Sequence, residues 1–322
     1  VVYQGRLHGP EQGKRTLLFF RGRDMRLRFQ PDWPILEELA GSVWVSDADL
    51  DIEVIKGKSG NLALTQGKVV GRRSDRDPHY HLSIESDLTS TLAESKKWVL
   101  TTPLRQELLP WLGELELHGP LQGRLKLDVP LGEKPKIGYQ LDLRTNNGRV
   151  AAPRYRLRYD QVEGALRLAT DQAVHADQIK ARFLGQPVTV RLQQSSDPTG
   201  HTTLLLTQEG RVDVADLTDW LDLQPLDFFQ GEAPYLAQLQ LPLTGGNGSE
   251  LTFESNLVGL GSSLPPPLSK APQQAVPLFL LTRFNSAGLE SLSLLLNEEI
   301  GFDLTFDAAG RDRGQILLGS SQ

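Results

Sequence analysis

The chain has 322 residues, of which 39% are hydrophobic and 23% are charged, with a net charge of −6 and no cysteine. This length suffices for one large or two ordinary domains, and the lack of cysteine excludes disulfides, thiolate metal sites and cysteine nucleophiles. Acidic and basic residues are interspersed without a block of like charge, so binding to nucleic acid or through a polybasic patch to a membrane is not indicated.

The N-terminal third predicts strands interrupted by short helices. Residues 34–40 follow a capping Asp32 and carry a proline in the first turn, which predicts about two turns of helix. Residues 49–54 alternate acidic and apolar side chains, as does a strand with one face in solvent. We expect two further short helices at residues 91–98 and 103–112.

Strand patterns dominate the middle of the chain. Residues 124–129, 139–144 and 188–193 each alternate apolar with polar side chains. The dipeptide Asn147-Gly148 is typical of a two-residue hairpin turn. Strands with one apolar and one polar face are typical of an antiparallel sheet that is solvated on one side, and not of a parallel sheet buried on both.

The last third continues the same pattern. Residues 213–221 begin with a capping aspartate and place apolar side chains at helical spacing, which predicts a short helix. Residues 239–241 and 302–306 alternate as strands do, and residues 245–248 predict a looser turn.

These elements predict a mainly β fold, an elongated and curved antiparallel sheet that forms a groove, with a few short helices. Such a sheet must hide its apolar face against a second sheet, by closing into a barrel, or as a trough that holds an apolar ligand. The expected helices are too few to cover so many one-sided strands, which makes the trough credible. Each buried methylene of an acyl chain would stabilise its binding by about 0.8 kcal/mol.

A weak repeat is present along the chain. A short helix followed by Gly119 and a strand ending in Leu131 matches a helix followed by Gly231 and a strand ending in Leu243. The copies are offset by 112 residues, and glycine and leucine are twelve positions apart in both. Repeated units of this kind grow along one axis. We therefore expect residues 1–322 to form a segment of one groove, with sub-repeats at 1–100, 101–212 and 213–322.

Candidate catalytic and metal sites are weak throughout the chain. Residues 9–14 are one residue too short for a phosphate-binding loop and predict a turn instead. Four side chains would share one side of a strand and could ligate zinc: Asp75, Asp77, His79 and His81. A proline interrupts that strand, which favours an exposed loop. No nucleophile elbow is present. We expect neither an enzyme nor a bound cofactor or metal.

The most distinctive segment spans residues 251–277. An alternating strand leads to two glycines, then to a proline triplet at 265–267, then to Lys270. The triplet predicts a rigid crossing in polyproline conformation between strands; the alternative places it at a groove rim with Lys270 near phosphate. In this order of residues the segment resembles the YhdP branch of the AsmA-like proteins. The Trp33-Pro34 pair resembles the same family, and the resemblance is strongest at residues 26–55 and 236–278.

The resemblance implies a function in the cell envelope of Gram-negative bacteria. It implies a periplasmic protein that is anchored to the inner membrane by a segment outside this chain, and whose β-groove conducts glycerophospholipids to the outer membrane. The chain begins with Val1, and we expect it to be part of that longer protein. The expected groove-lining residues are Leu141, Leu143, Leu239, Leu241, Leu251, Phe253, Leu257 and Leu304. The alternative is an all-β structural or protein-interaction module of the envelope, and an enzyme acting on envelope glycans is a third, more distant alternative.

Overall fold

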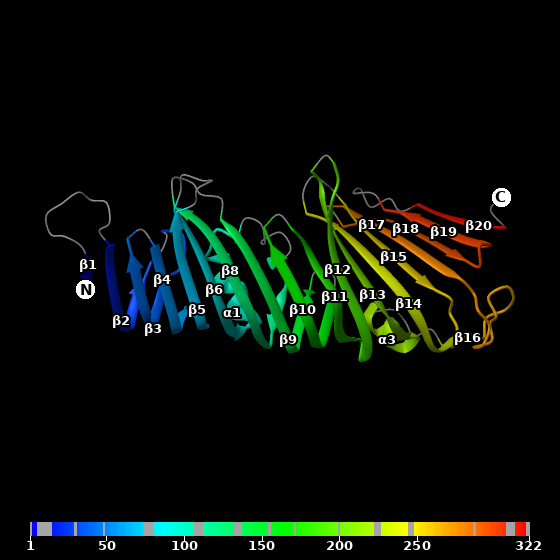
Figure 1. Ribbon diagram of the computed structural model, residues 1–322. Coiled ribbons are helices and arrows are strands. Elements are labelled where there is room, and N and C mark those ends of the chain that lie inside the picture. Colours follow the sequence, from blue (N-terminus) through cyan, green and yellow to red (C-terminus); the bar gives the residue numbers. More distant parts are fainter. Residues whose placement is uncertain are drawn as a thin grey trace. The chain divides into compact units, whose positions relative to one another are not determined.

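The computed structural model describes residues 2–4, 15–28, 31–47, 49–73, 80–105, 112–131, 137–153, 156–170, 172–198, 200–221, 227–243, 248–285, 288–306 and 313–319. Strands hold 72% of these residues, against about 20–25% in an average globular protein. The described part of the chain contains two helices with defined bounds, α1 (Leu92–Leu100) and α3 (Val214–Leu221). The mainly β, antiparallel sheet with few short helices that the sequence predicts is confirmed (Figure 1).

The chain divides into two compact units, which are best described separately. Unit 1 comprises Val1–Gly148 with Ala165–Gln172, and unit 2 comprises Arg149–Gly164 with Ala173–Gln322. The strands of unit 1 are β1 (Val2–Gln4), β2 (Arg15–Leu27), β3 (Leu36–Ser46), β4 (Asp49–Ser59), β5 (Leu62–Arg73), β6 (Tyr80–Thr91), β7 (Glu116–His118), β8 (Pro120–Leu131) and the first part of β9 (Gly138–Ala152). Each strand from β1 to β5 pairs antiparallel with its successor in the chain, and β8 pairs with β6 and β9.

Unit 2 is a meander of the same kind. Its strands are β10 (Leu157–Ala169, shared with unit 1), β11 (Gln172–Phe183), β12 (Gln186–Ser196), β13 (Thr202–Asp213), β14 (Phe229–Pro242), β15 (Gly248–Ser255), β16 (Leu260–Ser262), β17 (Leu278–Asn285), β18 (Gly288–Leu296), β19 (Ile300–Thr305) and β20 (Arg313–Leu318). From β11 to β20 each strand pairs with the next, except that β16 pairs with β14 and leaves β15 beside β17.

One face of the sheet is charged in both units. Cross-strand ion pairs stand on it, among them Arg124–Asp87 at 2.8 Å, Arg167–Asp142 at 2.5 Å, Arg191–Glu209 at 2.6 Å and Arg283–Glu250 at 3.1 Å. The Arg167 guanidinium holds the pKa of the Asp142 carboxyl below its usual range. Because side chains alternate along a strand, the residues between these charges point to the opposite, apolar face. The alternation seen in the sequence is therefore the division between these two faces.

The predicted helix at residues 34–40 is wrong, because β3 begins at Leu36. The register of β3 shifts twice against β4, around Glu37 and Ala40, and Glu38 has a φ of 53°. Such bulges insert extra residues into a strand and so change the spacing of its apolar side chains. Leu36 and Leu39, three residues apart, both pair with β2. Their helix-like spacing in the sequence therefore results from the bulges in this strand.

The predicted hairpin at Asn147-Gly148 is also wrong, since both residues lie inside the 15-residue strand β9. The backbone of Gly119 approaches this point so closely that a Cβ on Gly119 would lie 2.8 Å from the Gly148 Cα. The close approach therefore requires a glycine at position 119, whereas a Cβ on Gly148 would meet the side chains of Leu92 and Thr145 at 3.1 Å.

Two of the other predicted helices are confirmed. The Thr91 hydroxyl accepts a hydrogen bond from Glu94 N at 3.2 Å and caps α1, and the Asp213 carboxylate accepts one from Ala215 N at 2.8 Å at the start of α3. The helix predicted at 103–112 falls mostly on residues 106–111, outside the described residues, as does the turn at 245–247. The strands β14 and β15 on either side of that turn do pair.

A polar chain crosses the apolar core of unit 2. The core consists of Val162, Ala181, Phe183, Val188 and Val190. Beside it, the Tyr159 hydroxyl donates to Gln208 Oε1 at 2.5 Å, and Gln208 Nε2 donates to the Tyr235 hydroxyl. Burial raises the pKa of both tyrosines, so both remain protonated at neutral pH.

Replacing Gln208 by leucine is expected to lower the free energy of unfolding by about 1–3 kcal/mol, because two buried hydroxyls lose their partner. The triple variant Tyr159→Phe, Gln208→Leu, Tyr235→Phe should recover most of that loss, since removing every polar partner leaves no group unsatisfied. Urea unfolding of both variants measures the difference. A triple variant as unstable as Gln208→Leu alone would show that the amide acts through its shape and not through its hydrogen bonds.

Candidate functional site

The apolar face of unit 1 carries a partly open cavity of about 90 Å³. Its floor consists of side chains from β5, β6, β8 and β9 that point to one face: Leu62, Leu64, Ile84, Ser86, Leu88, Leu121, Leu125, Leu127, Leu141 and Leu143. The register pairs Leu125 with both Ser86 and Leu141, so these residues stand side by side across three strands. Because successive side chains of a strand point to opposite faces, every second residue of these strands contributes to the floor.

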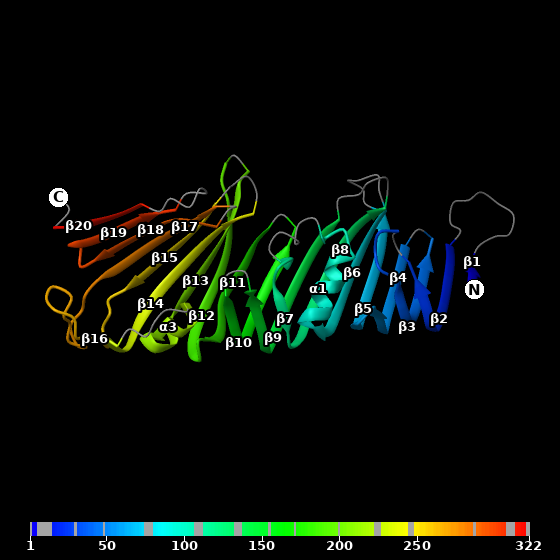
Figure 2. The same cartoon turned by 180° about the vertical axis from the view of Figure 1, so that it is seen from behind.

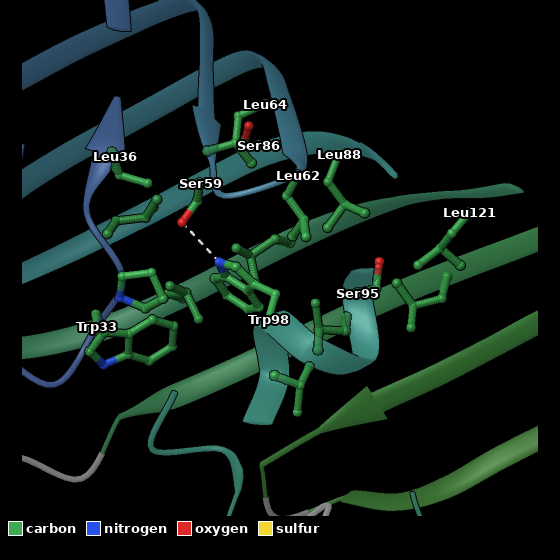
Figure 3. A pocket seen from close by; sticks show the side chains of 17 residues that line it. Trp33, Leu36, Ser59, Leu62, Leu64, Ser86, Leu88, Ser95, Trp98 and Leu121 are labelled. Carbon is green, nitrogen blue, oxygen red and sulfur yellow. Dashed lines mark hydrogen bonds between the residues drawn. The ribbon is translucent and has the colours of Figure 1, made fainter. Parts of the chain in front are cut away.

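The helix α1 forms the roof of this cavity. It lies against the apolar face of β5, β6 and β8 (Figure 2). From α1 the cavity receives Ser95, Trp98 and Val99, and Trp33 closes its side (Figure 3). The indoles of Trp33 and Trp98 meet edge to face, with ring centroids 5.9 Å apart. Trp98 Nε1 donates to the Ser59 hydroxyl at 2.8 Å, which orients the indole over the sheet.

The apolar face of unit 2 is covered at one side and open at the other. Trp220 of α3 packs edge to face on Phe183 at 5.6 Å and donates from Nε1 to Arg156 O at 2.7 Å. On the side that α3 covers, the apolar strand residues are buried; Val190, for example, is 6% exposed. Toward the last strands the exposure rises to 39% at Leu304 and 64% at Ile316. No helix lies over β17, β18 or β19 within the described residues.

Seven of the eight predicted lining residues lie on these two apolar faces. Leu141 and Leu143 line the cavity of unit 1. In unit 2 the register pairs Leu239 with Leu251, and it sets Leu241 and Phe253 on the same face as this pair. Leu304 pairs with Leu292 of β18. Because Leu292 lies opposite Thr282 of β17, and Thr282 lies opposite Leu251, Leu304 is on the same face as Leu251. Leu257 lies beyond the end of β15 with a φ of 52°, so strand register does not place it on either face.

Sequence reasoning missed the residues that close the cavity of unit 1. Trp33 and Trp98 are far apart in the sequence, and no local pattern brings them together. The helical pattern at residues 91–98 predicts a helix, but nothing in its spacing states which surface it covers. Among the floor residues, Leu125 and Leu127 already belong to a predicted alternating strand.

The last strands of unit 2 are apolar on both faces. Phe279, Leu295 and Leu317 point to the otherwise charged face and are 36–47% exposed. An open hollow of about 630 Å³ borders Phe279 and Leu295 and is edged by Glu254 and Glu298. The charged face is therefore not uniformly polar near the end of the sheet.

The proline segment of unit 2 connects β16 to β17, as predicted, but it forms a turn and not a continuous polyproline helix. Leu268 N donates to Pro265 O at 3.0 Å. Lys270 is buried at 9% exposure, and its ammonium donates to Leu260 O at 2.7 Å and to Ala271 O at 3.1 Å. Burial lowers the pKa of this lysine. Lys270 thus fastens the crossing to β16, which disfavours its alternative role at a lipid phosphate.

The proposed zinc ligands Asp75, Asp77 and His79 lie outside the described residues. The fourth, His81, lies with its Nδ1 3.4 Å from the Asp128 carboxylate. Within the described ranges no three histidine or acidic side chains converge as metal ligands would. Neither α1 nor α3 has the length of a membrane span, and no other helix of the described residues qualifies as one.

Comparison with known proteins gives two similarities. The profile of the family described as YhdP protein matches residues 1–322. Over 134 residues the chain is 32% identical to the intermembrane phospholipid transporter YhdP of Escherichia coli strain K12, which covers 39% of this chain and 10% of that protein. The match thus spans about a tenth of the length of that relative. No solved structure matches the chain.

Proposed function

The chain belongs to the YhdP protein family, and from that premise we propose that it is a non-enzymatic segment of a β-groove that conducts glycerophospholipids between the inner and outer membranes. It acts in the periplasm as part of a longer protein that is anchored to the inner membrane. Its partners are the acyl chains of glycerophospholipids and, through other parts of the protein, the two membranes.

The observation that carries this proposal is the uncovered apolar face of β15 and β17–β19 in unit 2. On this face the register places Leu251, Leu292 and Leu304 in one row, with the buried Thr282 (6% exposed) between Leu251 and Leu292, and it places Phe253, Leu280, Leu294 and Phe302 in the next row. A soluble protein rarely leaves a contiguous apolar patch of this kind without a partner. Apolar strands without convergent polar groups suit an acyl chain, whose binding is proportional to buried area and needs no specific hydrogen bond.

One observation favours the alternative, an envelope module without transport. In unit 1 the apolar face is covered by α1, and the remaining cavity of about 90 Å³ is smaller than the pockets of about 300–1,000 Å³ that bind small molecules. A sheet covered in this way is also what a packed interaction module would show. A lipid conduit must bind phospholipid, whereas an interaction module need not, so lipid binding distinguishes the two functions.

Purified under native conditions from a Gram-negative host, the chain is expected to carry glycerophospholipid that native mass spectrometry detects. After lipid is removed, phosphatidylethanolamine in vesicles should bind again, whereas glycerophosphoethanolamine, which has the same headgroup and no acyl chain, should not. The reason is that the open face offers apolar area and few polar partners. Protein that never carries lipid, or that binds the headgroup as well as the lipid, would favour the interaction module.

A further inference from the structure

The geometry points to α1 as a displaceable cover over an acyl-chain site on the apolar face of unit 1, an inference that rests on the proposed function. The site is the cavity floor formed by β5, β6, β8 and β9, whose lining includes Leu125 and Leu141. With α1 in place the cavity is about 90 Å³, smaller than the pockets of about 300–1,000 Å³ that bind small molecules. A lipid chain can therefore use this floor only when α1 moves away.

The packing of α1 is that of a cover and not of a core helix. None of its nine residues is fully buried, although the floor beneath includes Leu88, Leu121 and Leu125 at 4–6% exposure. A helix that belongs to a core presents a continuous apolar stripe to it. Here Trp98 and Val99 reach the cavity beside Ser95, whose hydroxyl is shielded from solvent and has no hydrogen-bond partner within the described residues. An unsatisfied hydroxyl in an apolar cavity disfavours the closed position.

Hydrogen bonds and an ion pair at the edge of α1 keep this helix in place over the sheet. Glu94 accepts a hydrogen bond from Asn61 Nδ2 at 2.5 Å and pairs with Lys97 at 2.7 Å. Lys96 donates to Gly113 O and Leu115 O, both at 2.7 Å. The bonds of Glu94 are exposed and exchange readily with water, whereas those of Lys96 are half-buried and the 2.8 Å hydrogen bond from Trp98 to Ser59 lies inside the cavity. Displacement thus trades these polar bonds for apolar contact between an acyl chain and the floor.

The helix α3 of unit 2 differs in this respect. Its Thr218 is buried at 5% exposure, and its Trp220 packs on a core that includes Phe183. We therefore assign the displaceable role to α1.

A reducible cross-link tests the inference, because the chain has no native cysteine. Asn61→Cys with Glu94→Cys, bridged by a disulfide-containing bismaleimide, fastens α1 to the turn between β4 and β5. The matched control, Glu85→Cys with Lys126→Cys, bridges two paired residues of β6 and β8 on the charged face. The probe is phosphatidylcholine with a diazirine at the end of one acyl chain, presented in vesicles. After irradiation, mass spectrometry locates the labelled peptides.

With the 61/94 bridge intact, labelling of the peptides that contain Leu125 and Leu141 is expected to fall about tenfold or more, and to return on reduction. The 85/126 bridge should leave it unchanged. Equal labelling with and without the 61/94 bridge would overturn the cover while the proposed function stands. Labelling confined to unit 2 in every state would overturn the acyl-chain site beneath α1. Labelling nowhere on the chain would overturn both this inference and the proposed function.

Discussion

Replacing Phe253 by aspartate in the full-length protein is expected to abolish phospholipid delivery to the outer membrane while the chain remains folded. Phe253 is half-buried and stacks on Tyr235 with ring centroids 5.2 Å apart, on the face that no helix of the described residues covers beyond β15. A carboxylate there can reach water, so it avoids the several kcal/mol that an unpaired charge costs in a packed core. Acyl chains, however, would meet a hydrated charge in the middle of their path.

The measurement combines thermal unfolding of the variant chain with an outer-membrane lipid-delivery assay in cells. Thr252→Asp is the matched control, because it introduces the same charge one residue earlier, on the charged face of β15. Delivery should be lost for Phe253→Asp and retained for Thr252→Asp. Unfolding of Phe253→Asp would indicate a closed core, and normal delivery by a folded variant would remove the main physical support for the conduit.

The sequence predicts the two faces of the sheet well, because the alternation has a single physical cause. A strand that is apolar on one side must turn every second side chain the same way, so the alternation alone assigns Leu125, Leu141 and Leu251 to the apolar face. The ion pairs of the opposite face follow from the same alternation. Only their partners, such as Asp87 for Arg124, require the register.

Features that depend on contacts between distant segments could not be predicted. The bulged start of β3 imitates helical spacing, and Asn147-Gly148 imitates a hairpin although it lies inside β9, where the backbone of Gly119 approaches it. The polar chain through Gln208 joins strands that are 49 and 27 residues away in the sequence. In each case the local sequence pattern predicts one structure, and contacts with a distant segment of the chain produce another.

The repeat also has a structural counterpart in its two glycines. Gly119 and Gly231 both have a positive φ, of 111° and 100°, and both lie against the backbone of another segment. A Cβ on Gly119 would be 2.7 Å from Asn147 O, and one on Gly231 would be 2.3 Å from Gly259 O. We propose that the two positions are equivalent points of the sub-repeats 101–212 and 213–322, where a strand begins beside a crossing backbone.

Gly231→Ala is therefore expected to lower the free energy of unfolding by about 3–5 kcal/mol. Two terms add: the positive φ strains any side chain, and the new Cβ meets a carbonyl oxygen that belongs to the backbone and cannot rotate away. Gly259, the residue it meets, also has a positive φ, and a Cβ on Gly259 would lie equally close to Glu232 O, so neither segment can shift without moving the other.

The variant Gly185→Ala separates the two terms, because its φ of 76° imposes strain while nothing lies within 4 Å of the added Cβ. Urea unfolding should show about 1–2 kcal/mol for Gly185→Ala, and Gly119→Ala should resemble Gly231→Ala if the repeat is real. Equal losses at positions 185 and 231 would mean that β16 moves freely away from β14, and the rigid crossing that follows it would then have no fixed anchor.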